Sequence, residues 1–519
     1  MTLKKIILFI PTLLLVVGCQ LDYKPENTMV DETVYKDEST AEAGLLGAYV
    51  NLCNFLSGAP DPINGYTANA YVFLFGDLGT DNLKARESYA SLFTIESSGY
   101  TSNDHEGTLK TVYLNGNKTV DLANNALEGI RTYGSYNPEK MKQHMAEAKF
   151  VRAYAHFYLL CLYGDGALLG KDDAPGIVLH LTPFEGYDAK AADVRSSNAT
   201  VWQQIIKDLE EALPDLPDAV PEVTDRVRAN KAVAQALLSR VYLYKGTATN
   251  NTEELRKAAD YAQKVLSTPG YSLKETSEAY LELFPRNTVD DSGKWSEPTV
   301  RSNELLFFER SRLSVDAFPS GIRGYLSKDG FFVPKSMADL YTAGDIRGCA
   351  EVEEKDGAGD HLIAIGSSSS FPKDLTSMKY PSNRSSISNN DVPYIRLAEM
   401  KLTHAEALTR VNAAVTPEAV AELNTIRKRA YTDPATAPAD LKPEDFADSQ
   451  ALLLEILKER RRELAYECHH RFDLMRTNNL IQDETLGKVP SDKWNLPFPE
   501  HEVRISSGKI VQNSGYPTK

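Results

Sequence analysis

Closely spaced cysteines are missing from this sequence of 519 residues. Its five cysteines are scattered and none forms a CxxC pair; they are Cys19, Cys53, Cys161, Cys349 and Cys468. Structural zinc sites and the disulfide frameworks of small secreted domains need such pairs, so the sequence predicts neither. Tryptophan is also scarce, with 3 copies against 26 tyrosines, a residue that suits both wet cores and sugar-binding surfaces.

Positive charge is in deficit. The chain has 57 Lys and Arg against 72 Asp and Glu, which gives a net charge of −15. An acidic protein is repelled by phosphate backbones and by anionic lipid, so nucleic acid and an anionic membrane surface are excluded as main partners. A neutral glycan or a peptide remains compatible with this charge.

Catalytic motifs are absent as well. The sequence contains no HExxH, no GxSxG and no GxGxxG that opens a helix after a strand. The stretch Gly164–Lys171 approaches a P-loop, but its glycines are one residue too far apart and Asp172 replaces the Ser or Thr. His469 and His470 are adjacent and lack a third ligand, so no metal and no cofactor is predicted. A pair of glycosidase carboxylates stays open, because only their separation in space would reveal it.

Long apolar runs are missing except at the N-terminus. Ile6–Val17 is too short to span a bilayer; it follows two lysines and precedes Gly18 and Cys19. This pattern resembles a lipoprotein signal peptide, cleaved before Cys19 so that the thiol is lipidated. Gln20, rather than aspartate, follows the cysteine and indicates sorting to the outer membrane.

The predicted domain organisation follows from these patterns. Residues 1–18 are the signal peptide, and residues 19–38, which are polar and lack periodicity, form a tether. Residues 39–519 form a single domain. Within it, residues 272–388 interrupt the helical pattern and are interpreted as an inserted loop-rich region.

Helical periodicity is strongest in Glu147–Gly164, which is apolar on two faces and therefore needs neighbours on both sides. Lys149, Arg152 and His156 form its only polar stripe. Gly164 is expected to end the helix in the left-handed conformation. We interpret this segment as the central helix of the domain.

Further helices are predicted on both sides of the central one, and many occur in pairs. They cover a segment opened by a capping box at Ser39–Glu42, then Leu109–Ile130, Val201–Leu213, Arg228–Lys245, Glu253–Ser267, Val392–Arg410, a helix capped by Thr416, and Ser449–Glu467. Alanines at the crossing points, with a glycine after one helix and a proline after its partner, are typical of tetratricopeptide-like repeats. The predicted fold is all-α dominated, a helical superhelix without a large sheet.

Several motifs resemble the SusD/RagB family of bacterial nutrient-binding lipoproteins. They are the central helix with its Tyr163–Asp165 turn, Tyr394–Glu399, Leu423–Ala430, Glu459–Leu464, Arg471–Arg476, Leu496–Glu500 and Gln512–Tyr516. The resemblance implies a tetratricopeptide-like superhelix with an irregular, loop-rich ligand-binding face. It also implies anchorage at the cell surface in the outer membrane and a SusC-type TonB-dependent transporter as partner. We interpret the Arg and Glu residues of these motifs as internal ion pairs.

Aromatic side chains on loops are the candidate ligand contacts, because a sugar stacks its apolar face on a ring while its hydroxyls need polar neighbours. The candidates are Trp295 in a polar segment, Tyr66 and Tyr71 in another, and Asp77, Asp81 and Asn82 as hydroxyl partners. The alternative, that each aromatic residue anchors its own loop, stays open.

The favoured function is a non-enzymatic surface protein that captures oligosaccharide or polysaccharide and delivers it to the transporter. Sustained helical pairing without a catalytic motif favours this interpretation. A peptide ligand is the nearest alternative, and a surface glycan hydrolase is the rival from another class.

Overall fold

The computed structural model describes residues 31–58, 72–86, 106–184, 194–274, 301–310, 331–348, 391–431 and 435–517. It also describes short pieces at 186, 276–277, 280, 282–284, 288–289, 295–296, 362–365, 374–377, 379–380 and 433. The predicted signal peptide, Cys19, Tyr66 and Tyr71 lie outside these residues. Among the helices described, none combines the length and the apolar character that a membrane span requires.

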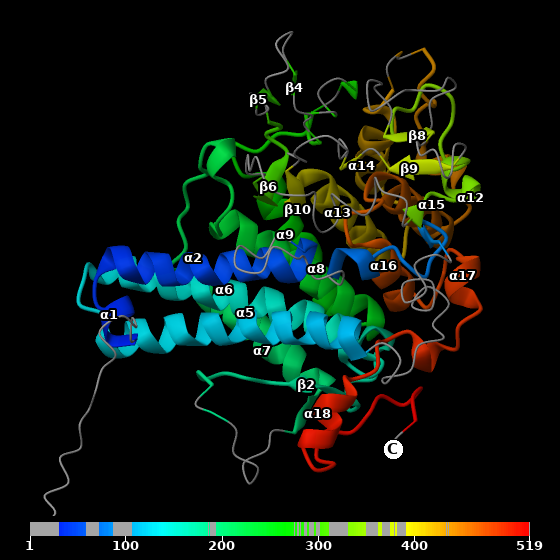
Figure 1. The fold of residues 1–519 in the computed structure, drawn as a ribbon. Coiled ribbons are helices and arrows are strands. Elements are labelled where there is room, and N and C mark those ends of the chain that lie inside the picture. Colours follow the sequence, from blue (N-terminus) through cyan, green and yellow to red (C-terminus); the bar gives the residue numbers. More distant parts are fainter. Residues whose placement is uncertain are drawn as a thin grey trace, which may run out of the picture.

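Helices make up most of the described chain, and consecutive helices lie side by side (Figure 1). The long ones are α2 (Glu38–Ser57), α5 (Glu106–Tyr133), α6 (Pro138–Tyr163), α7 (Asn198–Ala212), α8 (Lys231–Ala248), α9 (Thr252–Leu266), α13 (Leu397–Asn412), α14 (Pro417–Lys428) and α15 (Ser449–Glu463). Helix α6 contacts α5 and α7, α8 contacts α9, and α13 contacts α9, α14 and α15. The described residues contain no large sheet, so the predicted helical superhelix is confirmed.

Short elements precede, connect and follow the long helices. They are α1 (Asp31–Tyr35), α3 (Val72–Phe75), α12 (Lys335–Ala338), α16 (His470–Arg476), α17 (Glu484–Gly487) and α18 (Glu500–Ile505), with 3-10 turns η1 (Ala167–Leu169), η2 (Val223–Asp225), η3 (Pro443–Asp445) and η4 (Ser491–Lys493). Figure 1 shows α18 at the opposite end of the molecule from the strands β4 (Thr288–Val289) and β5 (Trp295–Ser296).

The strands described form two-stranded antiparallel ladders. Besides β4 with β5, the pairs are β1 (Lys84–Ala85) with β7 (Phe331–Phe332), β2 (Pro175–Val178) with β3 (Arg195–Ser197), β6 (Leu305–Glu309) with β10 (Val392–Arg396), and β8 (Ile363–Ile365) with β9 (Leu375–Ser377). The helix predicted from Val392 therefore begins at Leu397. The five preceding residues pair with β6, in a register that sets Val392 opposite Glu309 and Arg396 opposite Leu305.

The central helix is α6, and it starts earlier than its apolar pattern. The Asn137 side chain accepts hydrogen bonds from the backbone N–H groups of Glu139 (2.9 Å) and Lys140 (3.2 Å), and Pro138 fills the first position. Two of the three residues in the predicted polar stripe are buried. Arg152 pairs with Asp208 at 2.6 Å, and His156 is 0% exposed. The helix is thus enclosed on all sides along its second half.

The prediction for Gly164 is wrong in its conformation. The residue has φ −70° and ψ 121°, which is extended and not left-handed. Glycine is needed there for space, because a Cβ atom would lie 2.6 Å from Leu160 Cδ1 and 2.8 Å from Asn198 Oδ1. Close approach of α7 and not a positive φ therefore explains this glycine.

The N-terminal helices correct two further predictions. Helix α2 starts at Glu38 because Asp37, and not Ser39, caps it by accepting from the Thr40 backbone N–H at 3.1 Å. The last part of the predicted tether is folded, since Asp31–Tyr35 forms α1 and the Tyr35 ring is 5% exposed. This ring lies so close to Gly129 of α5 that a Cβ atom there would be 2.0 Å from it.

Three of the five residues in the charged block of α15 are buried, namely Glu459, Arg460 and Glu463. Glu463 is 0% exposed and accepts from Arg396 at 2.7 Å, from Arg347 at 2.8 Å, and from Arg429. Burial alone would raise the pKa of Glu463, but the three arginines hold this pKa well below its ordinary value. The interpretation of these motifs as internal ion pairs is confirmed.

Candidate ligand-binding site

The polar residues predicted to contact a ligand lie on residues 76–86, a segment held against the C-terminal part of the chain. The Arg471 backbone N–H donates to the Gly76 carbonyl at 2.8 Å, and the Tyr466 hydroxyl donates to the Asn82 carbonyl at 3.2 Å. These bonds join residues almost 400 positions apart in sequence. The segment that continues from Tyr71 is therefore fixed at this end.

Asp81 caps a helix from another part of the chain. Its carboxylate accepts from the backbone N–H groups of Glu484 (2.7 Å) and Thr485 (3.1 Å), at the start of α17. Its own backbone N–H donates to Asp483 at 2.8 Å. Burial raises the pKa of Asp483, but the hydrogen bond and charge of His470 outweigh burial and lower it to about 2.

Asp77 and Asn82 bond to each other. The Asn82 amide donates to Asp77 at 2.8 Å and accepts from Arg461 of α15 at 2.8 Å. Both side chains are buried, at 2% and 0% exposure, and burial raises the pKa of Asp77. The structure thus gives all three polar candidates internal partners, and their contact with a ligand stays a prediction.

The predicted aromatic contacts are described only in part. Trp295 lies in β5, where its backbone is paired with Val289 of the antiparallel strand β4. The other two tryptophans serve the core, since Trp202 is 0% and Trp494 5% exposed. Tyr66 and Tyr71 lie outside the described residues.

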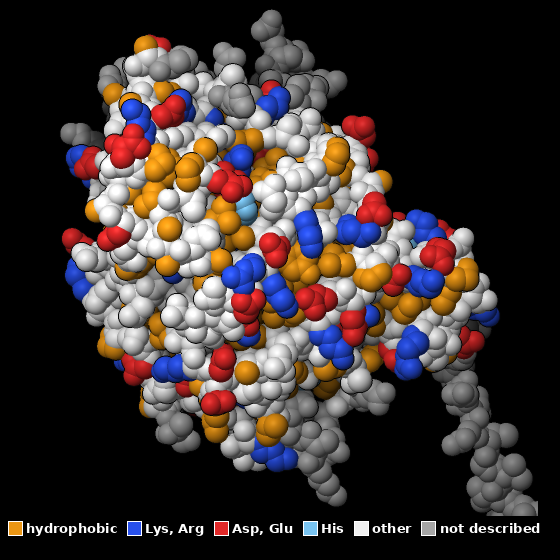
Figure 2. Space-filling model, turned by 180° about the vertical axis from the view of Figure 1, so that it is seen from behind, with side chains coloured by type: hydrophobic (Ala, Val, Ile, Leu, Met, Phe, Trp, Pro, Cys, Tyr) orange, Lys and Arg blue, Asp and Glu red, His pale blue; other side chains and the backbone are white. Residues whose placement is uncertain are grey.

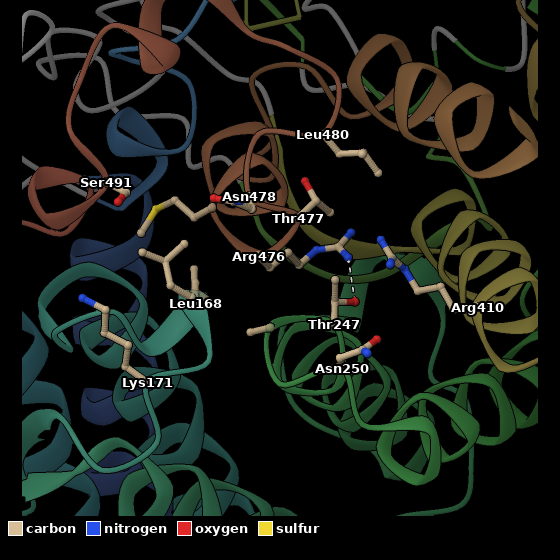
Figure 3. Close-up of a pocket in the computed structure, with 13 residues that line it drawn as sticks. Leu168, Lys171, Thr247, Asn250, Arg410, Arg476, Thr477, Asn478, Leu480 and Ser491 are labelled. Atoms are coloured by element: carbon tan, nitrogen blue, oxygen red, sulfur yellow. Dashed lines mark hydrogen bonds between the residues drawn. The ribbon is translucent and has the colours of Figure 1, made fainter. Parts of the chain in front are cut away.

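A pocket of about 490 Å³ lies where the C-terminal ends of α8, α13 and α16 meet η1 (Figure 3). It is lined by Leu168, Leu169, Lys171, Thr247, Ala248, Asn250, Arg410, Met475, Arg476, Thr477, Asn478, Leu480 and Ser491. Figure 3 shows Lys171 and Ser491 on one side, Arg410 and Asn250 on the other, and Arg476 between them. No local sequence pattern marks this pocket, because its walls come from distant segments.

The surface carries both signs of charge. Figure 2 shows acidic and basic side chains interspersed over the rear face, with apolar side chains scattered between them. No group of three or more His, Cys, Asp or Glu side chains within the described ranges is arranged to hold a metal ion.

Two family models match separate parts of the chain. The model of the SusD family matches residues 373–486, and a SusD-like model described as starch-binding and associating with the outer membrane matches residues 49–243. SusD-like protein P2 of Formosa agariphila is 25% identical over 98% of this chain and 99% of its own length. These matches include α2, α5 to α8 and the α13 to α16 region.

Solved structures share the fold. A SusD superfamily protein from Bacteroides thetaiotaomicron superposes with a TM-score of 0.70 at 21% identity, covering 92% of this chain and 99% of that one. A laminarin-binding SusD-like protein superposes with a TM-score of 0.65 at 21% identity, covering 93% and 100% of the two chains. Stacked helix pairs with short ladders between them define a tetratricopeptide-like helical scaffold. The chain belongs to the SusD/RagB family.

Proposed function

We propose that this protein is a cell-surface lipoprotein that binds an oligosaccharide or polysaccharide and delivers it to a SusC-type TonB-dependent transporter of the outer membrane. The family membership carries this proposal. The matching model over residues 49–243 is described as starch-binding and associating with the outer membrane. A solved relative that aligns with 93% of this chain binds laminarin. These descriptions favour a glycan over a peptide as the ligand.

The proposed anchor is the lipidated Cys19, after removal of residues 1–18. The tether then runs from residue 20 to α1, whose buried Tyr35 starts the folded domain. Replacing Cys19 by alanine should release the protein from the outer membrane or leave an unprocessed precursor, as judged by membrane fractionation. Normal membrane retention of this variant would contradict the anchor.

We propose that Trp295, Tyr66 and Tyr71 contact the glycan, and that Asp77, Asp81 and Asn82 supply polar partners or hold the segment that carries the tyrosines. Starch and laminarin are the first ligands to test, by affinity electrophoresis and calorimetry. Alanine at the three aromatic positions should weaken binding without changing the melting temperature. Tyr133→Ala on α5 is the matched control, since this ring is 41% exposed and lies outside the proposed site. Unchanged binding in all three variants would refute the assignment.

The rival function, a glycan hydrolase, makes a separate prediction. A glycoside hydrolase needs a carboxyl group with a raised pKa as its general acid. Among the described carboxyl groups with a clear shift, only Asp77 is raised, and it is buried against Asn82. Those buried in the ion-pair clusters have lowered pKa values; they are Glu406, Glu459, Glu463 and Glu467. Release of reducing ends from either glycan by the purified protein would favour the hydrolase instead.

The transporter partnership has its own test. Detergent extraction of cells grown on the bound glycan should co-purify a much larger outer-membrane protein. Deleting that transporter should abolish glycan import and leave glycan binding by this protein intact. Recovery of the protein only as a free monomer would argue against the partnership.

A further inference from the structure

The pocket between α8, α13 and α16 is lined by charged side chains of one sign. Three of its lining side chains are cationic, Lys171, Arg410 and Arg476, and none is acidic. Lys171 is exposed at one side of the pocket and Arg410 lies at the other side. Arg476 lies between them, with its guanidinium group facing that of Arg410 (Figure 3).

The charge behind the pocket does not cancel. Arg410, Arg460 and Arg476 share the two carboxylates of Glu406 and Asp473. Three guanidinium groups against two carboxylates leave one positive charge, and Lys171 adds a second. The C-terminal ends of the three helices oppose this with at most about 0.5 negative charge each. Among these groups, positive charge exceeds negative charge.

Arg476 has no donor left for a ligand. Its Nε–H donates to Asp473 at 2.8 Å, and one Nη1–H donates to Thr247 at 3.1 Å. Its remaining N–H groups face Glu406, at 2.6 and 2.8 Å, and Asp473, at 2.7 Å. Arg476 thus contributes charge and holds the wall of the pocket in place.

Arg410 differs, because among the described residues only its Nε–H has a partner, Glu406 at 2.9 Å. The side chain is 17% exposed, and its Nη2 atom is buried without a hydrogen-bond partner among the described residues. A buried donor without a partner costs free energy, so Nη2 leaves this guanidinium less well satisfied than that of Arg476. Nη1 is not buried, and it can donate a charge-assisted hydrogen bond to a carboxylate or sulfate oxygen in the pocket.

We propose that this pocket binds a small oxyanion, a carboxylate, sulfate or phosphate group, with Nη1 of Arg410 as its charged donor. The volume of about 490 Å³ exceeds that of an inorganic ion and accommodates a sugar-sized molecule that carries the anionic group. Thr247, Asn250, Asn478 and Ser491 supply hydroxyl and amide groups for the uncharged part. The site shares no residue with the proposed glycan contacts and stands independently of them.

The test uses the purified protein at constant ionic strength, with chloride as the reference anion. Sulfate, phosphate and glucuronate are titrated by calorimetry, and glucose is the neutral counterpart of glucuronate. The oxyanions should bind while glucose should not. If glucuronate binds more tightly than sulfate and phosphate, the site is assigned to a sugar acid. If sulfate or phosphate binds as tightly as glucuronate or more tightly, the site is assigned to a free oxyanion.

Two variants locate the site. Arg410→Gln should weaken oxyanion binding roughly tenfold or more, because it removes charged hydrogen bonds, while Glu406 keeps both bonds from Arg476. Lys171→Met alters an exposed side chain, so it preserves the fold and should weaken binding less. Arg256→Gln is the control, as that side chain is 49% exposed on α9. The proposal is overturned if no oxyanion binds better than chloride, or if both pocket variants bind like the wild type.

Discussion

His156 should make the stability of this protein fall in mildly acidic solution. It lies in the middle of α6 with 0% exposure, and neither ring nitrogen has a hydrogen-bond partner among the described residues. Burial is the main cause that lowers the pKa of His156 to about 3, and the charges of Arg152 and His180 lower it further. The folded protein therefore holds this imidazole neutral.

The direction and size of this change in stability follow from the linkage between folding and proton binding by His156. The unfolded chain has a histidine pKa of about 6.5, so between about pH 6.5 and pH 3 it binds a proton that the folded state does not. The contribution of His156 is fully present above about pH 6.5 and is lost as the pH falls, by about 1.4 kcal/mol per pH unit. Between about pH 7.5 and pH 5 this loss amounts to about 2 kcal/mol.

The assay is urea unfolding followed by circular dichroism at about pH 7.5 and about pH 5, above the range where most carboxylates titrate. His156→Leu removes the titrating group and keeps an apolar side chain in the buried site. The free energy of unfolding of this variant should fall by about 2 kcal/mol less than that of the wild type across this pH interval. His144 and His469 also have lowered pKa values and contribute equally to both proteins. An equal loss in the variant and the wild type would refute the reasoning.

Three further predictions concern packing and charge. Glu463→Gln should lower the free energy of unfolding by about 3–5 kcal/mol, because it removes a buried carboxylate that Arg347, Arg396 and Arg429 share; a loss in urea titrations below about 1 kcal/mol would contradict this. Gly129→Ala should displace the Tyr35 ring and expose α1 to proteolysis, whereas wild-type resistance would show that the contact is dispensable. Ala236→Leu should cost about 1–3 kcal/mol by overpacking α8, where this residue is 0% exposed; an unchanged melting temperature would argue against a close crossing.

The sequence predicted the helical segments well and their ends less well. Apolar periodicity is a local signal, so α5, α7, α9 and α15 were found close to their observed positions. The starts of α2 and α6 depend on Asp37 and Asn137, whose capping role shows only in their side-chain bonds. The strand β10 was interpreted as helix because its partner β6 lies more than 80 residues earlier in the sequence.

The candidate site was less accessible to sequence reasoning. The polar residues near Tyr71 suggested a ligand, but their partners, such as Thr485 and Arg461, are almost 400 residues away and could not be inferred. No sequence pattern marks Arg410. Its unused donors become evident only in comparison with Arg476, whose N–H groups all have partners. Residues that act through distant partners are recognised only once the fold brings them together.

The C-terminal tail of this chain completes the end of the central helix α6. The last turn of a helix leaves backbone carbonyls without partners inside the helix, and Gly164 does not satisfy them through a left-handed cap. The C-terminal tail does so instead. The Asn495 amide donates to the Cys161 carbonyl at 3.0 Å, the Leu496 N–H to Leu162 at 2.7 Å, and the Asn513 amide to Tyr163 at 3.0 Å. Since all three carbonyls belong to the core helix, the tail is part of the fold, and Asn495, Leu496 and Asn513 complete the end of α6.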